Sequence, residues 1–141
     1  MPWLLLPAML AFVSAAPVQD RFETISTKSG EIEAPLSGVG QIVFFRPRAL
    51  MWAVLGCGVL ESGNQLAKLG VGKYFTLSAT PGEHRYYAGS GKKISLHVSE
   101  GQTYYIKCRI SSGIIGRPTL SRSDREEFSD EASGLALTTS R

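Results

Sequence analysis

The chain has 141 residues, of which 43% are hydrophobic and 19% charged, and its formal net charge is +3. This length suits a single domain, and this composition excludes a wholly disordered chain. The lysines and arginines are spread along the sequence, with no run longer than Lys92-Lys93. Because a nucleic-acid binder concentrates its basic residues in a patch or stripe, the sequence predicts a mildly basic domain without a nucleic-acid partner.

The first expected element is a secretory signal peptide at residues 1–15. Trp3 to Val13 form an uncharged apolar run. At roughly 11 residues, such a run is too short to span a bilayer but suits the core of a signal peptide. Small residues favour cleavage after Ala15, which predicts a secreted or periplasmic protein. No basic residue precedes the run, so either the α-amino group supplies the usual positive charge or the true start lies upstream. An uncleaved membrane anchor is the alternative to the signal peptide, and membrane contact is expected only in that case.

The next segment, residues 16–37, is polar and shows no sustained period. It contains Gly30, Pro35 and several serines and threonines, which favour irregular structure. We expect a flexible leader or linker here, in which a short strand near Phe22 to Ile25 is the one candidate element.

Residues 38–120 carry short β-rich runs separated by turn signals. This pattern predicts an all-β fold, an antiparallel β-sandwich of the immunoglobulin-like or prealbumin-like type. The first expected strand, QIVFFRP, ends at Pro47, which lacks the N–H that a ladder requires. The run MWAVLGCGVLESGNQLAKL is expected to form a hairpin that turns at residues 62–64.

The later strands are also expected to pair as hairpins. Pro81-Gly82 is expected to turn KYFTLSA back into EHRYYAG, and residues 99–101 to join KKISLHV to TYYIKCRI. Residues 113–120, with the sequence GIIGRPTL, are expected to form a loop.

Side chains in these runs alternate with a period of two, which predicts one buried and one solvated face for each sheet. Cys57 and Cys108 fall on the inner faces. An oxidising compartment would permit a disulfide between them, whereas two buried free thiols would show the same pattern.

Residues 121–135 change to a helical pattern. Ser123 lies three residues before Glu126, the spacing of a capping box, and Gly134 closes the segment. We expect a short C-terminal helix that packs on the sandwich through a narrow apolar stripe, followed by a frayed tail at residues 136–141.

The stretch around His84 raises the question of catalysis. Pro81 and Gly82 predict a structural turn, and His84 has inward parity, which is typical of a histidine bonded to a nearby backbone group. A hydrolase or transferase that uses His84 with Glu83 is the alternative. His97 has the opposite parity, and the two histidines show no metal-ligand spacing. We therefore expect no catalytic site, no metal and no cofactor.

A binding surface is predicted instead from outward-facing aromatic and basic side chains. The candidates are Tyr74, Tyr87, Tyr105, Lys107 and Arg109. An aromatic and basic face suits a protein, peptide or glycan partner. For the tyrosines, packing between neighbouring strands is the alternative.

The order of several segments resembles the bacterial domain-of-unknown-function family 2846. These segments are QIVFFRPRAL, SGNQLAKLGVGKYF, TPGEHRYY, ISLHVSEGQTYYIKC and GRPTLSRSDREE. The resemblance covers residues 40–134 and implies a small exported β-sandwich with a Pro-Gly-x-His turn. It implies no reaction, because the family has none assigned. Many relatives look like lipoproteins, whereas no cysteine lies near the expected cleavage point here.

Together these observations predict an exported β-sandwich module of the cell envelope that binds a protein, peptide or glycan without catalysis. A purely structural accessory protein, assembled through exposed strand edges, is a further alternative. The sequence leaves the partner and the oligomeric state open.

Overall fold

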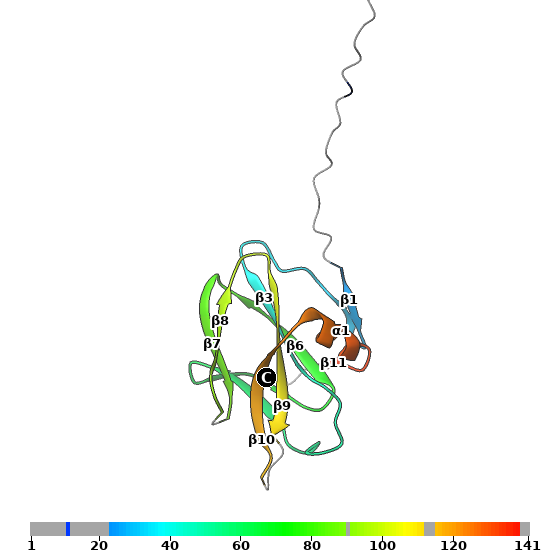
Figure 1. The fold of residues 1–141 in the computed structure, drawn as a ribbon, viewed down its shortest axis with the longest axis vertical. Helices are drawn as coiled ribbons and strands as arrows, with labels where there is room; N and C mark the ends of the chain where they lie inside the picture. Colours follow the sequence, from blue (N-terminus) through cyan, green and yellow to red (C-terminus); the bar gives the residue numbers. More distant parts are fainter. Residues whose placement is uncertain (1–10, 12–22, 90, 112–114, 139–141) are drawn as a thin grey trace, which may run out of the picture.

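The computed structural model describes residue 11 and residues 23–89, 91–111 and 115–138. In this part of the chain two β-sheets pack face to face, and a short helix and a small hairpin lie outside one of them (Figure 1). The five-stranded sheet has the order β10 (Arg117–Ser123), β9 (Thr103–Ser111), β3 (Gly40–Arg46), β6 (Lys73–Ala79), β11 (Ala136–Leu137). The four-stranded sheet has the order β5 (Asn64–Leu69), β4 (Cys57–Glu61), β7 (Gly82–Ala88), β8 (Ile94–Val98). The predicted all-β sandwich with one short helix near the C-terminus is confirmed.

The core between the two sheets includes side chains that the period of two assigned to the inner faces, among them Phe75, Val98 and Ile106. Alternate residues of β6 and β9 enter it, as do those of β4 and β7. Its buried members include Ile42, Phe44, Val59, Leu69, Phe75, Tyr86, Val98, Ile106 and Leu120. The ring of Phe44 stacks on that of Phe75 at 4.8 Å and meets Tyr86 edge-on at 5.1 Å. The burial of these apolar side chains holds the sheets together.

The pairing of the strands departs from the expected run of hairpins. The turn at Ser62-Gly63 does join β4 to β5, but β6 and β7 lie in different sheets, as do β8 and β9. The Pro81-Gly82 turn and residues 99–101 are therefore crossings from one sheet to the other. Two pairs are parallel, β3 with β9 and β6 with β11. Alternation specifies the face on which a side chain lies but not the strand beside it, which is why the hairpins predicted at Pro81-Gly82 and at residues 99–101 were wrong, whereas the one at residues 62–64 is confirmed.

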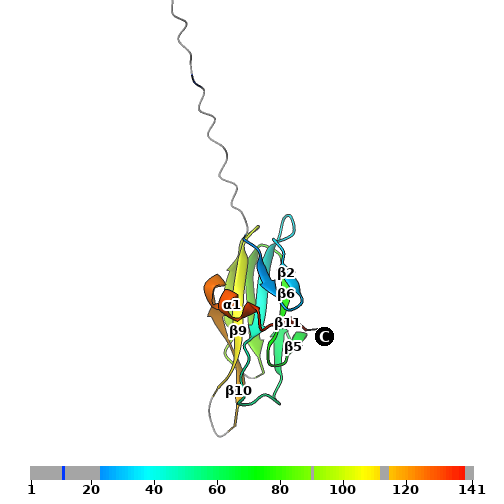
Figure 2. The same ribbon diagram turned by 90° about the vertical axis from the view of Figure 1, so that its right-hand side faces the viewer.

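A second core lies on the outer face of the five-stranded sheet, which was expected to be solvated. The helix α1 (Arg125–Ala132) and the hairpin of β1 (Ile25–Thr27) and β2 (Gly30–Ile32) cover this face. Figure 2, turned by 90°, shows both facing the viewer. The buried side chains are Ile25, Ile32, Val43, Phe45, Tyr74, Tyr105, Phe128, Ala132 and Leu135. Strand β3 is consequently buried along its whole length.

Three boundaries predicted from the sequence need correction. Residues 25–32 of the expected flexible leader form the hairpin, and residues 136–137 of the expected frayed tail pair with β6. Residues 117–120 of the expected loop at 113–120 belong to strand β10, which extends the sandwich to Ser123. Hydrogen bonds to neighbouring strands, which short polar segments do not reveal by their own pattern, account for all three.

The helix also begins one residue later than the capping-box pattern indicated. Asp124 is the N-cap, and its carboxylate accepts a hydrogen bond from the Glu127 backbone N–H at 2.8 Å. The Ser123 hydroxyl instead donates to the side chain of Glu127 at 2.6 Å. The C-cap is Ser133, and the Gly134 N–H bonds to the Glu131 carbonyl at 3.0 Å. Aspartate caps a helix as effectively as serine, so the cap lies at Asp124 and not at the predicted Ser123.

No helix in the described ranges is long and apolar enough to cross a membrane. The signal peptide predicted at residues 1–15 lies outside the described residues apart from residue 11, as does Phe22.

Candidate functional site

The three tyrosines predicted to share an outward face do not lie together. Tyr74 and Tyr105 are 4% and 7% exposed and pack against Phe128 of α1, with ring centroids 6.1 and 5.4 Å away. Burial raises the pKa of Tyr105. Tyr87 lies on the other sheet, where its hydroxyl accepts a hydrogen bond from the Gly63 N–H at 3.1 Å. Parity was assigned correctly, but the helix covers the face that Tyr74 and Tyr105 were expected to expose.

The two predicted basic contacts have different surroundings. The Lys107 ammonium donates to the Glu127 carboxylate at 2.8 Å, so it joins β9 to α1. This hydrogen bond, with a second one from Ser123, lowers the pKa of Glu127. Arg109 is exposed. Lys107 and Arg109 both line the pocket beside Trp52.

His84 is held at both ring nitrogens. Its Nε2 lies 2.7 Å from the Thr80 carbonyl oxygen, and its Nδ1 lies 3.0 Å from Oε1 of Glu61. A carbonyl and a carboxylate both accept hydrogen bonds, so the protonated ring, in which both nitrogens carry a hydrogen, satisfies both partners. The hydrogen bond with Glu61 raises the pKa of His84, against the opposing effect of burial.

This geometry corrects the proposed pairing of His84 with Glu83. Glu83 is exposed and lies opposite His97 on β8, whereas Glu61 reaches His84 from the neighbouring strand β4. The His84 ring is also parallel to that of Tyr86, with centroids 6.1 Å apart. Burial raises the pKa of Tyr86, as does the nearby Glu61 carboxylate to a smaller extent. Both ring nitrogens of His84 are thus engaged by groups of the protein itself, Glu61 and Thr80.

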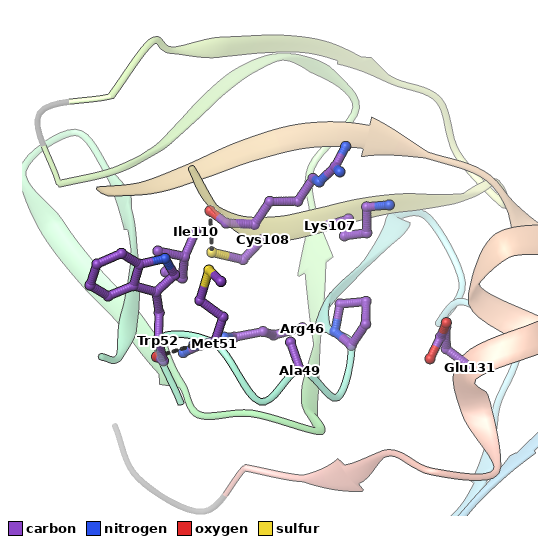
Figure 3. A pocket seen from close by; sticks show the side chains of 10 residues that line it. Arg46, Ala49, Met51, Trp52, Lys107, Cys108, Ile110 and Glu131 are labelled. Atoms are coloured by element: carbon purple, nitrogen blue, oxygen red, sulfur yellow. Dashed lines mark hydrogen bonds between the residues drawn. The ribbon is translucent and has the colours of Figure 1, made fainter. Parts of the chain in front are cut away.

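The surface that the sequence reading missed lies at the end of the sandwich where β3 and β9 finish. Residues 47–56, which connect β3 to β4, meet Gly116 there through Trp52. We call these residues, together with Ile115 beside Gly116 in the sequence, the loop end. A pocket of about 340 Å³ opens beside them (Figure 3). Its walls are Arg46, Pro47, Ala49, Met51, Trp52, Lys107, Cys108, Arg109, Ile110 and Glu131.

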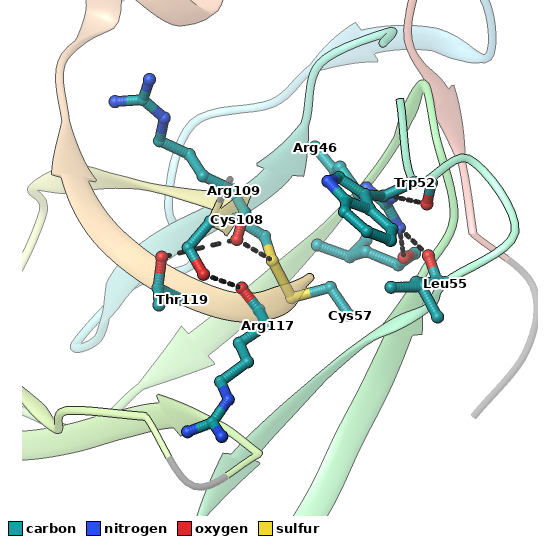
Figure 4. Close-up of a disulfide and its surroundings, with 10 residues drawn as sticks. Arg46, Trp52, Leu55, Cys57, Cys108, Arg109, Arg117 and Thr119 are labelled. Carbon is teal, nitrogen blue, oxygen red and sulfur yellow. Dashed lines mark hydrogen bonds between the residues drawn. A yellow bond between two sulfur atoms is a disulfide. The ribbon is translucent and has the colours of Figure 1, made fainter. Parts of the chain in front are cut away.

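The backbone of the loop is held from inside by Arg46, whose side chain is 3% exposed. Its guanidinium donates to the carbonyl oxygens of Trp52 at 3.0 Å, of Leu69 at 3.2 Å and of Leu55 (Figure 4). Burial lowers the pKa of Arg46. Because buried charge is tolerated only when it is hydrogen-bonded, the loop and the arginine stabilise each other.

The side chains of the loop, by contrast, point into solvent. Leu50 is 99% exposed, Val54 95%, Met51 67% and Ile115 70%. The indole of Trp52 lies against Gly116, where an added Cβ would come within 2.7 Å of the ring. The loop end therefore combines a backbone held by hydrogen bonds at Trp52 and Leu55 with four exposed apolar side chains and one half-buried tryptophan.

The sequence did contain a signal for this loop. The run from Ala49 to Leu55 is apolar but lacks the alternation that marks the neighbouring strands. The sequence predicts the first arm of a hairpin over this run, whereas the hairpin begins only at Cys57.

A disulfide links the two sheets beneath the pocket. Cys57 of β4 and Cys108 of β9 are bonded, and the two residues are at most 1% exposed. Figure 4 shows the bond between the strands, with the side chains of Arg109 and Arg117 extending away from it. The pairing of the two inward cysteines is confirmed, and the bond ties the start of β4 to the strand that carries the pocket wall.

Comparison of the chain with protein-family models, with curated proteins and with solved structures found no match. The resemblance to family 2846 therefore stays a prediction.

Proposed function

We propose that the chain is an exported, non-catalytic binding module of the cell envelope, and that the loop end is its contact surface. The observation that carries this proposal is the set of four apolar side chains of the loop end that are each at least 67% exposed, one of which, Met51, also lines the pocket. Single exposed apolar residues are ordinary on a protein surface, but a group of them beside a concave pocket is typical of an interaction site.

The anchoring of the loop supports binding without a large rearrangement. Since Arg46 already bonds two carbonyl oxygens of the loop, those of Trp52 and Leu55, the loop loses little conformational freedom when a partner covers it. Trp52 and Arg109 add the residue types that most often dominate binding energy. The loop end therefore replaces the tyrosine face as the proposed recognition site, with Arg109 retained from it.

The disulfide supports export, because such bonds persist in oxidising compartments and are rare in the cytosol. At His84, what supports a non-catalytic role is the engagement of both ring nitrogens by Glu61 and Thr80. The histidine hydrolase remains the weaker candidate for that reason.

Site-specific photo-crosslinking in the native envelope tests the proposal. A photoreactive amino acid would replace Met51 at the loop end, and a matched one would replace Leu36, which is 69% exposed in the connection between β2 and β3. We expect a discrete, saturable adduct from position 51 and none from position 36. Equal adducts from both positions, or none from either, would contradict the proposal.

A further inference from the structure

We infer that the loop end docks on an anionic lipid surface, into which its apolar side chains insert. The inference rests on the proposed function in that it uses the same contact surface, and it names the partner. Three features carry it: the extreme exposure of the apolar side chains, the way the loop is anchored, and the distribution of charge along the sandwich.

The apolar side chains of the loop end project outward and do not line a groove. Leu50 and Val54, at 99% and 95% exposed, have almost no contact with the rest of the protein. Anchors of protein–protein interfaces usually fit pockets and are partly packed by their neighbours. Side chains that stand free of their own protein suit a soft apolar medium, which closes around them without a matching shape. Insertion of such residues at the headgroup boundary is how peripheral proteins hold a bilayer.

The anchoring of the loop keeps these side chains extended. The guanidinium of Arg46 fixes the carbonyl groups of Trp52, Leu55 and Leu69 from the protein side. The backbone therefore cannot readily collapse and bury Leu50 against the pocket. Trp52, half-buried at the base of the loop, is a residue type enriched at membrane interfaces.

Charge is distributed unevenly between the two ends of the sandwich. Strands β3 and β9 run parallel and finish at the loop end, and the connection between β7 and β8 lies at the same end, where Gly89 approaches Pro118 of β10. The exposed charged residues described at or near this end include Arg48, Lys92, Lys93, Arg109 and Arg117. Near the opposite end the exposed residues include Glu33, Glu83 and Glu100. Among the charged walls of the pocket, Arg46 is buried against carbonyl oxygens and Lys107 pairs with Glu127. Arg109 is the exposed cation there, and Glu131 is acidic.

A surface that combines exposed apolar tips with several cations is complementary to anionic lipid headgroups above an apolar core. Each basic residue near such a membrane adds about fivefold to the binding constant at physiological salt. Each inserted leucine or valine adds roughly tenfold or more through the apolar area that leaves water. The acidic end would point away from the bilayer, because like charges repel.

The test measures the surroundings of two labelled positions in the disulfide-bonded protein recovered after export. An environment-sensitive fluorophore is attached through Val54→Cys, and in a matched sample through Leu36→Cys at the opposite end. Each sample is titrated with vesicles of phosphatidylcholine alone and of phosphatidylcholine with phosphatidylglycerol. We expect a blue shift at position 54 with the anionic vesicles, reversed by high salt, and no shift at position 36.

Two variants then separate the apolar and the electrostatic contributions, with position 54 as the labelled site in each. Leu50→Ser is expected to weaken binding to the anionic vesicles about tenfold. Arg48→Gln is expected to weaken it about fivefold, while Arg85→Gln, on an exposed position of β7, leaves it within twofold. Far-ultraviolet circular dichroism checks that every variant keeps the fold.

Four outcomes overturn the inference. The first three are no blue shift at position 54, equal shifts at positions 54 and 36, and an equal response to neutral and anionic vesicles. The fourth is a blue shift at position 54 without vesicles, together with a molecular mass in solution that rises with protein concentration. The last would show that a second copy covers the loop end. A protein adduct at position 51 in the crosslinking experiment, together with no vesicle binding, would leave the proposed function standing and refute only the lipid partner.

Discussion

Replacing Phe128 with alanine tests whether the second core stabilises the domain or is merely appended to it. Phe128 is fully buried, and its ring meets those of Phe45, Tyr74 and Tyr105 at 5.1, 6.1 and 5.4 Å. Removing a buried phenylalanine ring costs about 3–5 kcal/mol, from lost transfer free energy and from the cavity left behind. In a domain of this size, roughly 4 °C of melting temperature is lost per kcal/mol. Phe128→Ala is therefore expected to lower the melting temperature by about 12–20 °C.

Urea unfolding, followed by tyrosine absorbance and by near-ultraviolet circular dichroism, measures this free energy. Both signals should report unfolding at the same, lower urea concentration, because Tyr74 and Tyr105 contact the missing ring. Leu36→Ala, at a side chain 69% exposed, is the control and should change the free energy of unfolding by less than about 0.5 kcal/mol. A change below about 1 kcal/mol for Phe128→Ala would refute the reasoning, since the outer layer would then contribute little to the fold.

Three further predictions concern the links between elements. Replacing both cysteines of the disulfide with serine should lower the free energy of unfolding by about 4 kcal/mol on the chain-entropy model, because 51 residues separate them, and thermal denaturation would measure it. The raised pKa of His84 means that its pairing with Glu61 stabilises the fold fully below the unfolded pKa and loses this effect as pH rises through the folded pKa. Glu61→Gln should therefore remove a stability difference between mildly acidic and alkaline urea titrations; an unchanged pH profile would contradict the pairing. The lowered pKa of Glu127 gives the opposite pH dependence of stability. Its pairing with Lys107 stabilises the fold above the unfolded pKa, and this effect is lost as pH falls through the folded pKa. A double-mutant cycle for this half-exposed pair should give a coupling below about 1 kcal/mol that shrinks in acid, and a coupling that persists in acid would be inconsistent with it.

The candidate site was largely beyond the reach of the sequence. Tyr105 shows why. The alternation correctly placed Tyr105 and Ile106 on opposite faces of the sheet, but whether the face of Tyr105 is exposed to solvent depends on where α1 packs. The loop end depends on Arg46, whose role as an anchor requires Leu55 and Leu69 to come near the end of β3. The local sequence pattern predicts neither the contact of α1 with the outer face nor the hydrogen bonds of Arg46, because both join residues that only the folding of the whole chain brings together.

By itself, the sequence determined the class of the protein and the interior of the sandwich. Period-two alternation in β6, β7 and β9 placed Phe75, Tyr86 and Cys108 on inner faces, since successive side chains of a strand point to opposite sides. The tertiary structure decided which strands are neighbours, which outer face is covered, and where apolar side chains remain exposed. Those outcomes depend on contacts between segments that are distant in the sequence, and such contacts stabilise the fold only after the entropy cost of bringing the segments together has been met.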